Sequence, residues 1–142
     1  MTSPLTEAGL TQLGHRLGRS LPSGAVVWLE GPLGAGKTTL VRAILESRAP
    51  ERAVTSPTFN LVHRHEGRQG AAFHVDCYRL RHPAEAAELD WSEMLGADLL
   101  LIEWPDRGGC WVPSPTLRIQ LDHASQPDQR TVSLDPPLGN DP

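Results

Sequence analysis

Apolar and polar residues follow two different periodicities along this chain, and their order predicts a mixed α/β fold. Leucines recur at near-helical spacing within residues 6–19, which predicts an N-terminal amphipathic helix. Residues 25–30 form a short apolar run, as expected for a strand buried in a parallel sheet. Helical spacing returns over residues 37–47. Strand, glycine-rich loop and helix therefore follow one another in the first third of the chain.

The later segments are shorter and are typical of strands. Residues 66–70 hold the polar and glycine residues of a turn between two of them. Residues 83–89 are rich in Ala and Glu and begin with a proline, which predicts a short helix. The predicted strands are residues 59–65, 71–76, 97–102, 117–121 and 131–134.

The loop after the first strand carries a phosphate-binding motif. Residues 31–38 read Gly-Pro-Leu-Gly-Ala-Gly-Lys-Thr, which matches the P-loop pattern G-x-x-x-x-G-K-[ST]. The glycines let backbone N–H groups converge on one anion, and the helix N-terminus adds partial positive charge. We therefore predict a nucleotide site formed by Leu33, Gly34, Ala35, Gly36, Lys37, Thr38 and Thr39.

Lys37 and the two threonines after it have distinct expected roles. Lys37 is the only lysine beside twelve arginines. Its compact ammonium can lie between the β- and γ-phosphates, where a guanidinium is too wide. The Thr38 hydroxyl can reach a Mg²⁺ bound to the same phosphates. Thr39 is either a second phosphate contact or simply a residue of the first helical turn.

Acidic residues end two of the predicted strands and are candidates for metal binding and catalysis. Glu103 follows the apolar run of residues 99–102, as a Walker B carboxylate does, or it is a surface acid. In either case we expect it at a strand end beside solvent. Asp76 ends residues 71–76 and is a second candidate for a metal or a water. A polar loop that could order around a γ-phosphate, as switch loops do, consists of Thr55, Ser56, Pro57 and Thr58.

These features predict a P-loop NTPase-type α/β domain over residues 1–135, with a mostly parallel central sheet, flanking helices and antiparallel additions. Residues 136–142 are expected to be a disordered tail. The charge of −4 disfavours direct binding to nucleic acid. With no apolar run of membrane-spanning length and no export signal, we expect a cytoplasmic protein with reduced Cys77 and Cys110.

The histidines of the predicted strands suggest zinc as an alternative ligand. His63 and His65 would share one strand face, with His74 and Cys77 nearby. Their spacing matches no standard structural zinc pattern, so we predict no zinc.

Four blocks of sequence resemble the TsaE (YjeE) family, a small ATPase of bacterial tRNA threonylcarbamoyladenosine formation. The last two, His-Val-Asp-Cys-Tyr-Arg-Leu and Leu-Ile-Glu-Trp-Pro, are far more specific than the P-loop. The chain departs from the family at Pro32, at residues 89–91 and at Leu10, so we name no adenine contacts. The four blocks are residues 31–39, 55–59, 74–80 and 101–105.

The resemblance implies a division of roles. Lys37 contacts the phosphates, Thr38 and Glu103 bind Mg²⁺, Asp76 is required for ATP hydrolysis, and Trp104 lies close to the nucleotide. Members bind TsaD and TsaB and use ATP hydrolysis to reset them. Their ATP hydrolysis is implied to be slow when they are alone and faster in that complex. Contact with tRNA would then be only indirect, through the complex.

The residues alone are also compatible with two other functions. A small-molecule or nucleoside kinase would use the same loop to deliver phosphate, and a nucleotide-sensing module would bind without turnover. A GTPase is disfavoured, because the guanine-reading Asn-Lys-x-Asp motif needs a second lysine. Arg79 and Arg107 are each candidates for an arginine finger; alternatively, Arg79 braces the fold and Arg107 contacts a partner.

Overall fold

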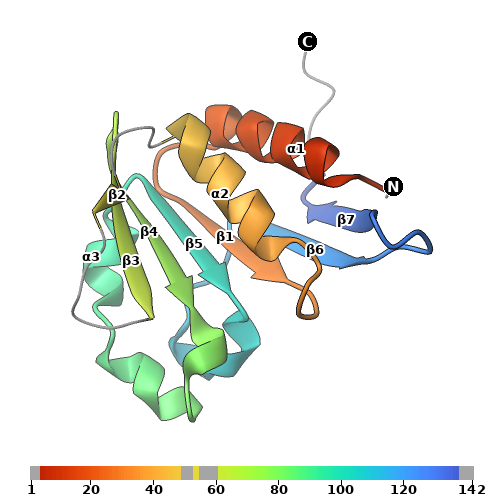
Figure 1. Cartoon of the computed structure of the whole chain (residues 1–142). Coiled ribbons are helices and arrows are strands. Elements are labelled where there is room, and N and C mark those ends of the chain that lie inside the picture. The colour runs from red at the N-terminus through yellow and green to blue at the C-terminus, as the bar shows by residue number, and fades with distance from the viewer. Residues whose placement is uncertain (1–3, 49–52, 55–60, 138–142) are drawn as a thin grey trace.

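A twisted β-sheet forms the centre of the molecule, with the long helices α1 and α2 packed side by side on one face (Figure 1). The structure is a computed structural model that describes residues 4–48, 53–54 and 61–137. The helices are α1 (Glu7–Ser20), α2 (Lys37–Arg48) and α3 (Trp91–Leu95), and the 3₁₀ segments are η1 (Cys77–Arg79), η2 (Pro83–Glu88) and η3 (Pro105–Trp111).

Within the described residues, the sheet has seven strands in the order β2-β3-β4-β5-β1-β6-β7. The four central strands, from β4 to β6, run parallel, and antiparallel pairs extend the sheet at both edges. This confirms the predicted α/β class with a parallel centre. The strands are β1 (Ala25–Glu30), β2 (Ala53–Val54), β3 (Val62–Gly67), β4 (Gly70–Asp76), β5 (Leu99–Glu103), β6 (Leu117–His123) and β7 (Arg130–Asp135).

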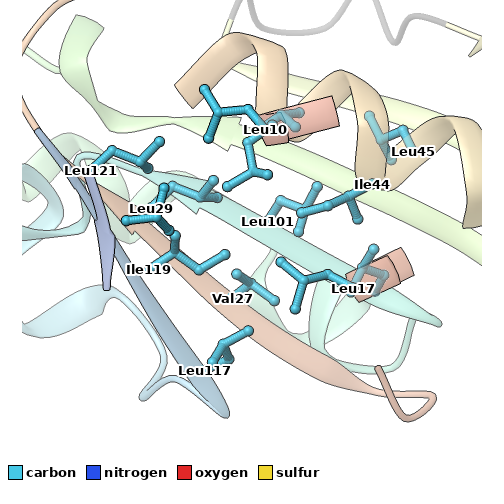
Figure 2. Close-up of a cluster of buried hydrophobic side chains, with 14 of the residues drawn as sticks. Leu10, Leu17, Val27, Leu29, Ile44, Leu45, Leu101, Leu117, Ile119 and Leu121 are labelled. Carbon is cyan, nitrogen blue, oxygen red and sulfur yellow. The ribbon is translucent and has the colours of Figure 1, made fainter. Parts of the chain in front are cut away.

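Each face of the sheet buries its own apolar cluster. Alternate residues of β5 point to opposite faces, so Leu101 packs under α1 and α2 while Leu100 and Ile102 pack on the other side. Figure 2 shows the first cluster, in which Val27 and Leu29 of β1 lie beneath the leucines and isoleucine of the two helices. Burial on both faces explains why β1 and β5 read as almost continuous apolar runs.

Helices α1 and α2 approach closely because glycines lie between them. A Cβ added to Gly14 would lie 2.4 Å from Cβ of Ala43, and one added to Gly18 would lie 2.6 Å from the carbonyl oxygen of Ile44. No larger side chain fits at either position without moving the helices.

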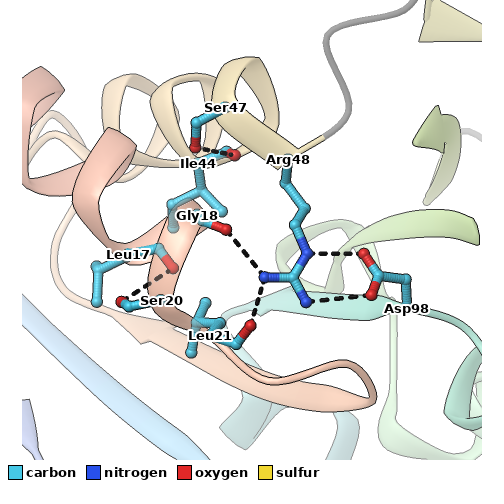
Figure 3. A network of polar contacts seen from close by, with 8 residues as sticks. All are labelled: Leu17, Gly18, Ser20, Leu21, Ile44, Ser47, Arg48 and Asp98. Carbon is cyan, nitrogen blue, oxygen red and sulfur yellow. Dashed lines mark hydrogen bonds and ion pairs between the residues drawn. The ribbon is translucent and has the colours of Figure 1, made fainter. Parts of the chain in front are cut away.

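A buried ion pair ties the end of α2 to α1 and to Asp98, the residue just before β5 (Figure 3). Nε and Nη2 of Arg48 donate to the two carboxylate oxygens of Asp98 at 2.7 and 3.1 Å. Its remaining terminal nitrogen donates to the carbonyl oxygens of Gly18 and Leu21 at the end of α1. Burial acts to raise the pKa of Asp98, but hydrogen bonds from Arg48 and Ser23 and the Arg48 charge hold it below its ordinary value.

Some short elements differ from the prediction. The helix expected over residues 83–89 is the 3₁₀ segment η2, and Leu89 already has extended backbone angles. Pattern alone predicted neither the five-residue α3 nor η3, because neither is long enough to show a helical period. Pro136 and Pro137 belong to the described residues, whereas the rest of the expected tail lies outside them.

Candidate functional site

The loop between β1 and α2 has the backbone geometry that its glycines allow. Gly34 and Gly36 have φ values of 77° and 102°, in the left-handed region that other residues rarely adopt. A Cβ on Gly36 would also lie 2.7 Å from Cδ1 of Leu10 in α1. The loop then enters α2 at Lys37, so its N–H groups and the helix N-terminus lie together.

A pocket of about 640 Å³ opens beside this loop. The loop residues and the ends of β4 and β5 form one side of it. The start of α1 and the segment around the start of β7 lie next to the loop and complete the lining. Its lining consists of Thr6, Glu7, Ala8, Leu10, Leu33, Gly34, Gly36, Lys37, Thr38, Thr39, Asp76, Tyr78, Glu103, Trp104, Asp128 and Arg130.

Nearly all the predicted site residues that fall in the described part of the chain line this pocket. Ala35 does not, because its side chain is buried in the core under α1 and α2. The predicted switch-like loop, Thr55, Ser56, Pro57 and Thr58, lies outside the described residues.

Lys37 lines the pocket and is only 5% exposed. Its ammonium donates to the carbonyl oxygen of Gly31 and, at 2.9 Å, to that of Pro32. It also lies 4.4 Å from the centroid of the Trp104 ring, within cation–π range. Burial lowers the pKa of Lys37, and the nearby carboxylates of Glu103 and Asp76 offset that effect only in part.

Two carboxylates meet at the carboxyl ends of adjacent parallel strands. Asp76 of β4 and Glu103 of β5 are direct partners in the register. The Asp76 carboxylate also accepts from the backbone N–H of Tyr78 at 3.0 Å, which caps η1.

The expectation that Glu103 lies beside solvent was wrong. Glu103 is 6% exposed, because β5 is a central strand and neighbours cover its end on both sides. Its Oε2 lies 2.6 Å from Nε2 of His74. The sequence did not indicate this contact, since it depends on the register between β4 and β5.

Trp104 is held against the pocket by unusual backbone geometry. Its φ and ψ are 56° and 51°, a left-handed conformation that bulky residues adopt only where the surroundings enforce it. Its ring lies 4.9 Å from that of Tyr78. The Arg107 guanidinium lies 4.3 Å from the Tyr78 ring and 5.6 Å from the Trp104 ring. Arg107 is thus beside the site, while Arg79 is exposed and does not line the pocket.

The part of the lining formed by the starts of α1 and β7 was not predicted. Leu5 and Arg130 exchange backbone hydrogen bonds of 2.6 and 2.7 Å, which brings the start of α1 beside β7. Nε of Arg130 donates to the carbonyl oxygen of Gly34 at 3.0 Å. Asp128 and Glu7 add acidic groups to the same part of the lining. No local pattern signals a bridge between segments 125 residues apart.

The donors around the pocket suit Mg²⁺ bound together with phosphates. Thr38, Asp76 and Glu103 offer hydroxyl and carboxylate oxygens, the ligands that Mg²⁺ prefers. Among the described residues, no three His, Cys, Asp or Glu side chains gather as a metal site of their own. Mg²⁺ at nucleotide sites needs no such cage, since phosphates and waters complete its shell.

Comparison with known proteins identifies one family. The model of the family described as "Threonylcarbamoyl adenosine biosynthesis protein TsaE" matches residues 5–132. Proteins named "tRNA threonylcarbamoyladenosine biosynthesis protein TsaE" are similar. The one from Mycobacterium tuberculosis is 38% identical, over 93% of this chain and 83% of its own length. The relative from Streptomyces coelicolor is 38% identical, over 81% of this chain and 80% of its own length. For Rickettsia conorii the identity is 35%, over 82% of this chain and 67% of the relative.

A crystal structure of Bacillus YdiB has the same fold. It superposes with a TM-score of 0.73 at 21% identity and covers 94% of this chain and 84% of its own. In the part of the chain that the structure describes, every helix is too short or too polar to cross a membrane.

Proposed function

This chain belongs to the TsaE family of threonylcarbamoyladenosine biosynthesis proteins, and on that premise we propose that it binds Mg²⁺–ATP and hydrolyses it. One observation carries the proposal. A single pocket gathers the phosphate-binding loop with Lys37 and Thr38 and the carboxylates of Asp76 and Glu103. A loop, a lysine and two carboxylates at one place are the parts that nucleotide hydrolysis requires.

The loop and α2 would hold the phosphates. Backbone N–H groups of the loop would donate to the phosphate oxygens, and the N-terminus of α2 would add partial positive charge. Lys37 would leave its carbonyl partners and place its ammonium between the β- and γ-phosphates. Trp104, whose ring already lies over that ammonium, would then pack against the nucleotide.

Thr38 and Glu103 would hold Mg²⁺, which when bound neutralises charge on the phosphate oxygens. Asp76 would accept a hydrogen bond from a water and orient it. The oxygen of this water would form a bond to the γ-phosphorus as the bond to the β–γ bridging oxygen breaks, giving ADP and a phosphate that keeps the protons of the water. Lys37 would stabilise the negative charge that develops on the departing oxygen.

Hydrolysis would serve a larger assembly. We propose TsaB and TsaD as partners, with ATP hydrolysis resetting their complex between turnovers. The biosynthetic pathway named in the relatives supports this. The net charge of −4 supports indirect rather than direct contact with tRNA.

The test measures phosphate release from ATP with and without Mg²⁺, TsaB and TsaD. We expect slow Mg²⁺-dependent release from the wild-type chain and faster release with both partners. Asp76→Asn should bind ATP but release little phosphate, and Glu103→Gln should lose most of the Mg²⁺-dependent phosphate release. Glu66→Gln, which changes a half-exposed acid of β3 outside the pocket, serves as the control.

Two outcomes would contradict the proposal. ATP binding without any ADP formation, even with both partners present, would favour a nucleotide-sensing module. Phosphorylation of an added small acceptor in place of phosphate release would favour a kinase.

A further inference from the structure

A histidine outside the predicted site contacts one of its carboxylates. Nε2 of His74 lies 2.6 Å from Oε2 of Glu103. The two side chains are only 17% and 8% exposed. An ionised carboxylate only accepts hydrogen bonds, so the ring donates from Nε2. A short bond of this kind between side chains with little access to water is strong and directional.

The sheet register explains why these side chains meet. His74 pairs with Leu101 and Asp76 pairs with Glu103, on the adjacent parallel strands β4 and β5. Since side chains alternate along a strand, His74 and Asp76 share a face with Glu103. Asp76 and Glu103 line the pocket and His74 does not. His74 therefore lies one step behind the two carboxylates, away from the pocket.

A second histidine supports the first from the neighbouring strand. His63 of β3 is the direct partner of His74 in the register. The two rings stack, with centroids 6.0 Å apart and planes 29° from parallel. Stacking restricts how the His74 ring can turn, so Nε2 stays directed at Glu103.

We propose that His74 is a positioning residue that holds the Glu103 carboxylate in the orientation that binds Mg²⁺–nucleotide. With Oε2 held by the ring, Oε1 is the oxygen that can turn to a ligand in the pocket. Without His74, the side chain of Glu103 would sample several rotamers, and binding would have to order it. This inference rests on the proposed function and adds His74 to the residues that support Mg²⁺–ATP binding.

The experiment compares the wild-type chain with His74→Leu, which removes the donor, and His74→Gln, which restores one near the position of Nε2. Calorimetric titration gives the Kd for ATP with Mg²⁺ and with EDTA. We expect His74→Leu to weaken Mg²⁺-dependent ATP binding about tenfold, as loss of groups behind metal ligands does. Binding in EDTA should change less than about twofold, because the loop and Lys37 hold the phosphates. His74→Gln should recover most of the loss.

The matched control is His65→Leu. His65 lies on the same face of β3 as His63, but it pairs with Ala72 of β4 and does not line the pocket. The control variant should bind Mg²⁺–ATP like the wild type. The inference is overturned if His74→Leu binds Mg²⁺–ATP normally, or if His74→Gln does not recover. It is also overturned if binding in EDTA and the thermal midpoint fall together, since that marks a structural role. If the wild-type chain binds ATP with the same Kd in Mg²⁺ and in EDTA, the proposed role of Mg²⁺ in ATP binding is instead wrong.

Discussion

At the scale of single residues, burial gives the two cysteines different thiol reactivity. Cys77 is buried in the apolar cluster opposite α1 and α2, and burial raises the pKa of its thiol to about 12. Cys110 is exposed. We expect one thiol to react rapidly with a thiol reagent at pH 8 in the native protein, and both to react in denaturant, because only thiolates are nucleophilic. Cys110→Ser should abolish the rapid reaction. Two rapid thiols in the native protein would contradict the burial of Cys77.

The single lysine gives a second prediction at this scale. Lys37→Arg keeps the charge but replaces a compact ammonium that is 5% exposed with a wide, planar group. We expect ATP affinity to fall at least about tenfold, since the guanidinium cannot fit between two phosphates beside Trp104. Arg42→Lys, an exposed position of the same helix, is the reverse exchange and should leave affinity unchanged. Equal affinities of wild type and Lys37→Arg in a titration would show that the ammonium is not required.

These residues also mark what the sequence could predict about the site. The P-loop and the acids at two strand ends were predictable, because each is a local motif on an element of clear period. The bond from His74 to Glu103 and the left-handed backbone of Trp104 were not. The first depends on register between strands, and the second on packing against Tyr78 and Arg107. The roles of the predicted site residues stay predictions.

At the scale of elements, the contact between α1 and α2 depends on glycine. We expect Gly14→Ala and Gly18→Ala each to destabilise the protein by about 1–3 kcal/mol, because the new methyl groups would collide with α2. Gly9→Ala is the matched control in the same helix, since its Cβ would lie 3.2 Å from the nearest atom of the Leu5 side chain, which needs to shift only slightly. Gly9→Ala should be neutral or stabilising, by up to about 1 kcal/mol, through helix propensity. Urea unfolding measures all three, and equal losses at the three positions would refute the packing argument.

The buried ion pair gives a pH-dependent prediction at the same scale. Arg48→Met should cost about 3–5 kcal/mol at pH 7, because it leaves Asp98 buried without its partner. In the wild type the pKa of Asp98 is lowered from 3.8, so the stability it contributes is present above pH 3.8 and is lost as pH falls through the lower folded-state value.

The difference in unfolding free energy between Arg48→Met and wild type should therefore narrow as the pH falls from 7 to below 3.8. Urea titrations at several pH values measure it. A difference independent of pH would show that Arg48 acts through its carbonyl contacts with Gly18 and Leu21 and not through Asp98.

Among the elements, long or strongly patterned segments were predictable and short ones were not. The bounds of β1 match the prediction, and those of α2 differ by one residue. The segments between β4 and β6 that fold as η2, α3 and η3 are held by caps, prolines and tertiary contacts. Such contacts join residues whose local pattern is not periodic, so the pattern carries little information about them.

At the scale of the whole molecule, the pocket is closed by segments from near both ends of the chain. The bridge between Leu5 and Arg130 places the start of α1 and the start of β7 beside the P-loop. The sequence could not predict this, because nothing local relates two segments so far apart. Binding of ATP at the P-loop should therefore also stabilise the segments around Leu5 and Arg130.

Arg130 is the residue through which that coupling can be tested. Its backbone pairs with Leu5 and its guanidinium donates to Gly34 of the P-loop, so it joins three segments at the edge of the pocket. We expect Arg130→Met to weaken ATP binding about three- to tenfold, the effect of one partly exposed charged hydrogen bond that fixes the loop. Arg118→Met on the neighbouring strand β6 removes an arginine that pairs with Glu30 outside the pocket, and ATP affinity should not change. Amide hydrogen exchange with and without ATP should show protection of residues 5–10 in the wild type and less in Arg130→Met. If both arginine variants bind ATP equally well, the closure between the two ends of the chain does not contribute to nucleotide binding.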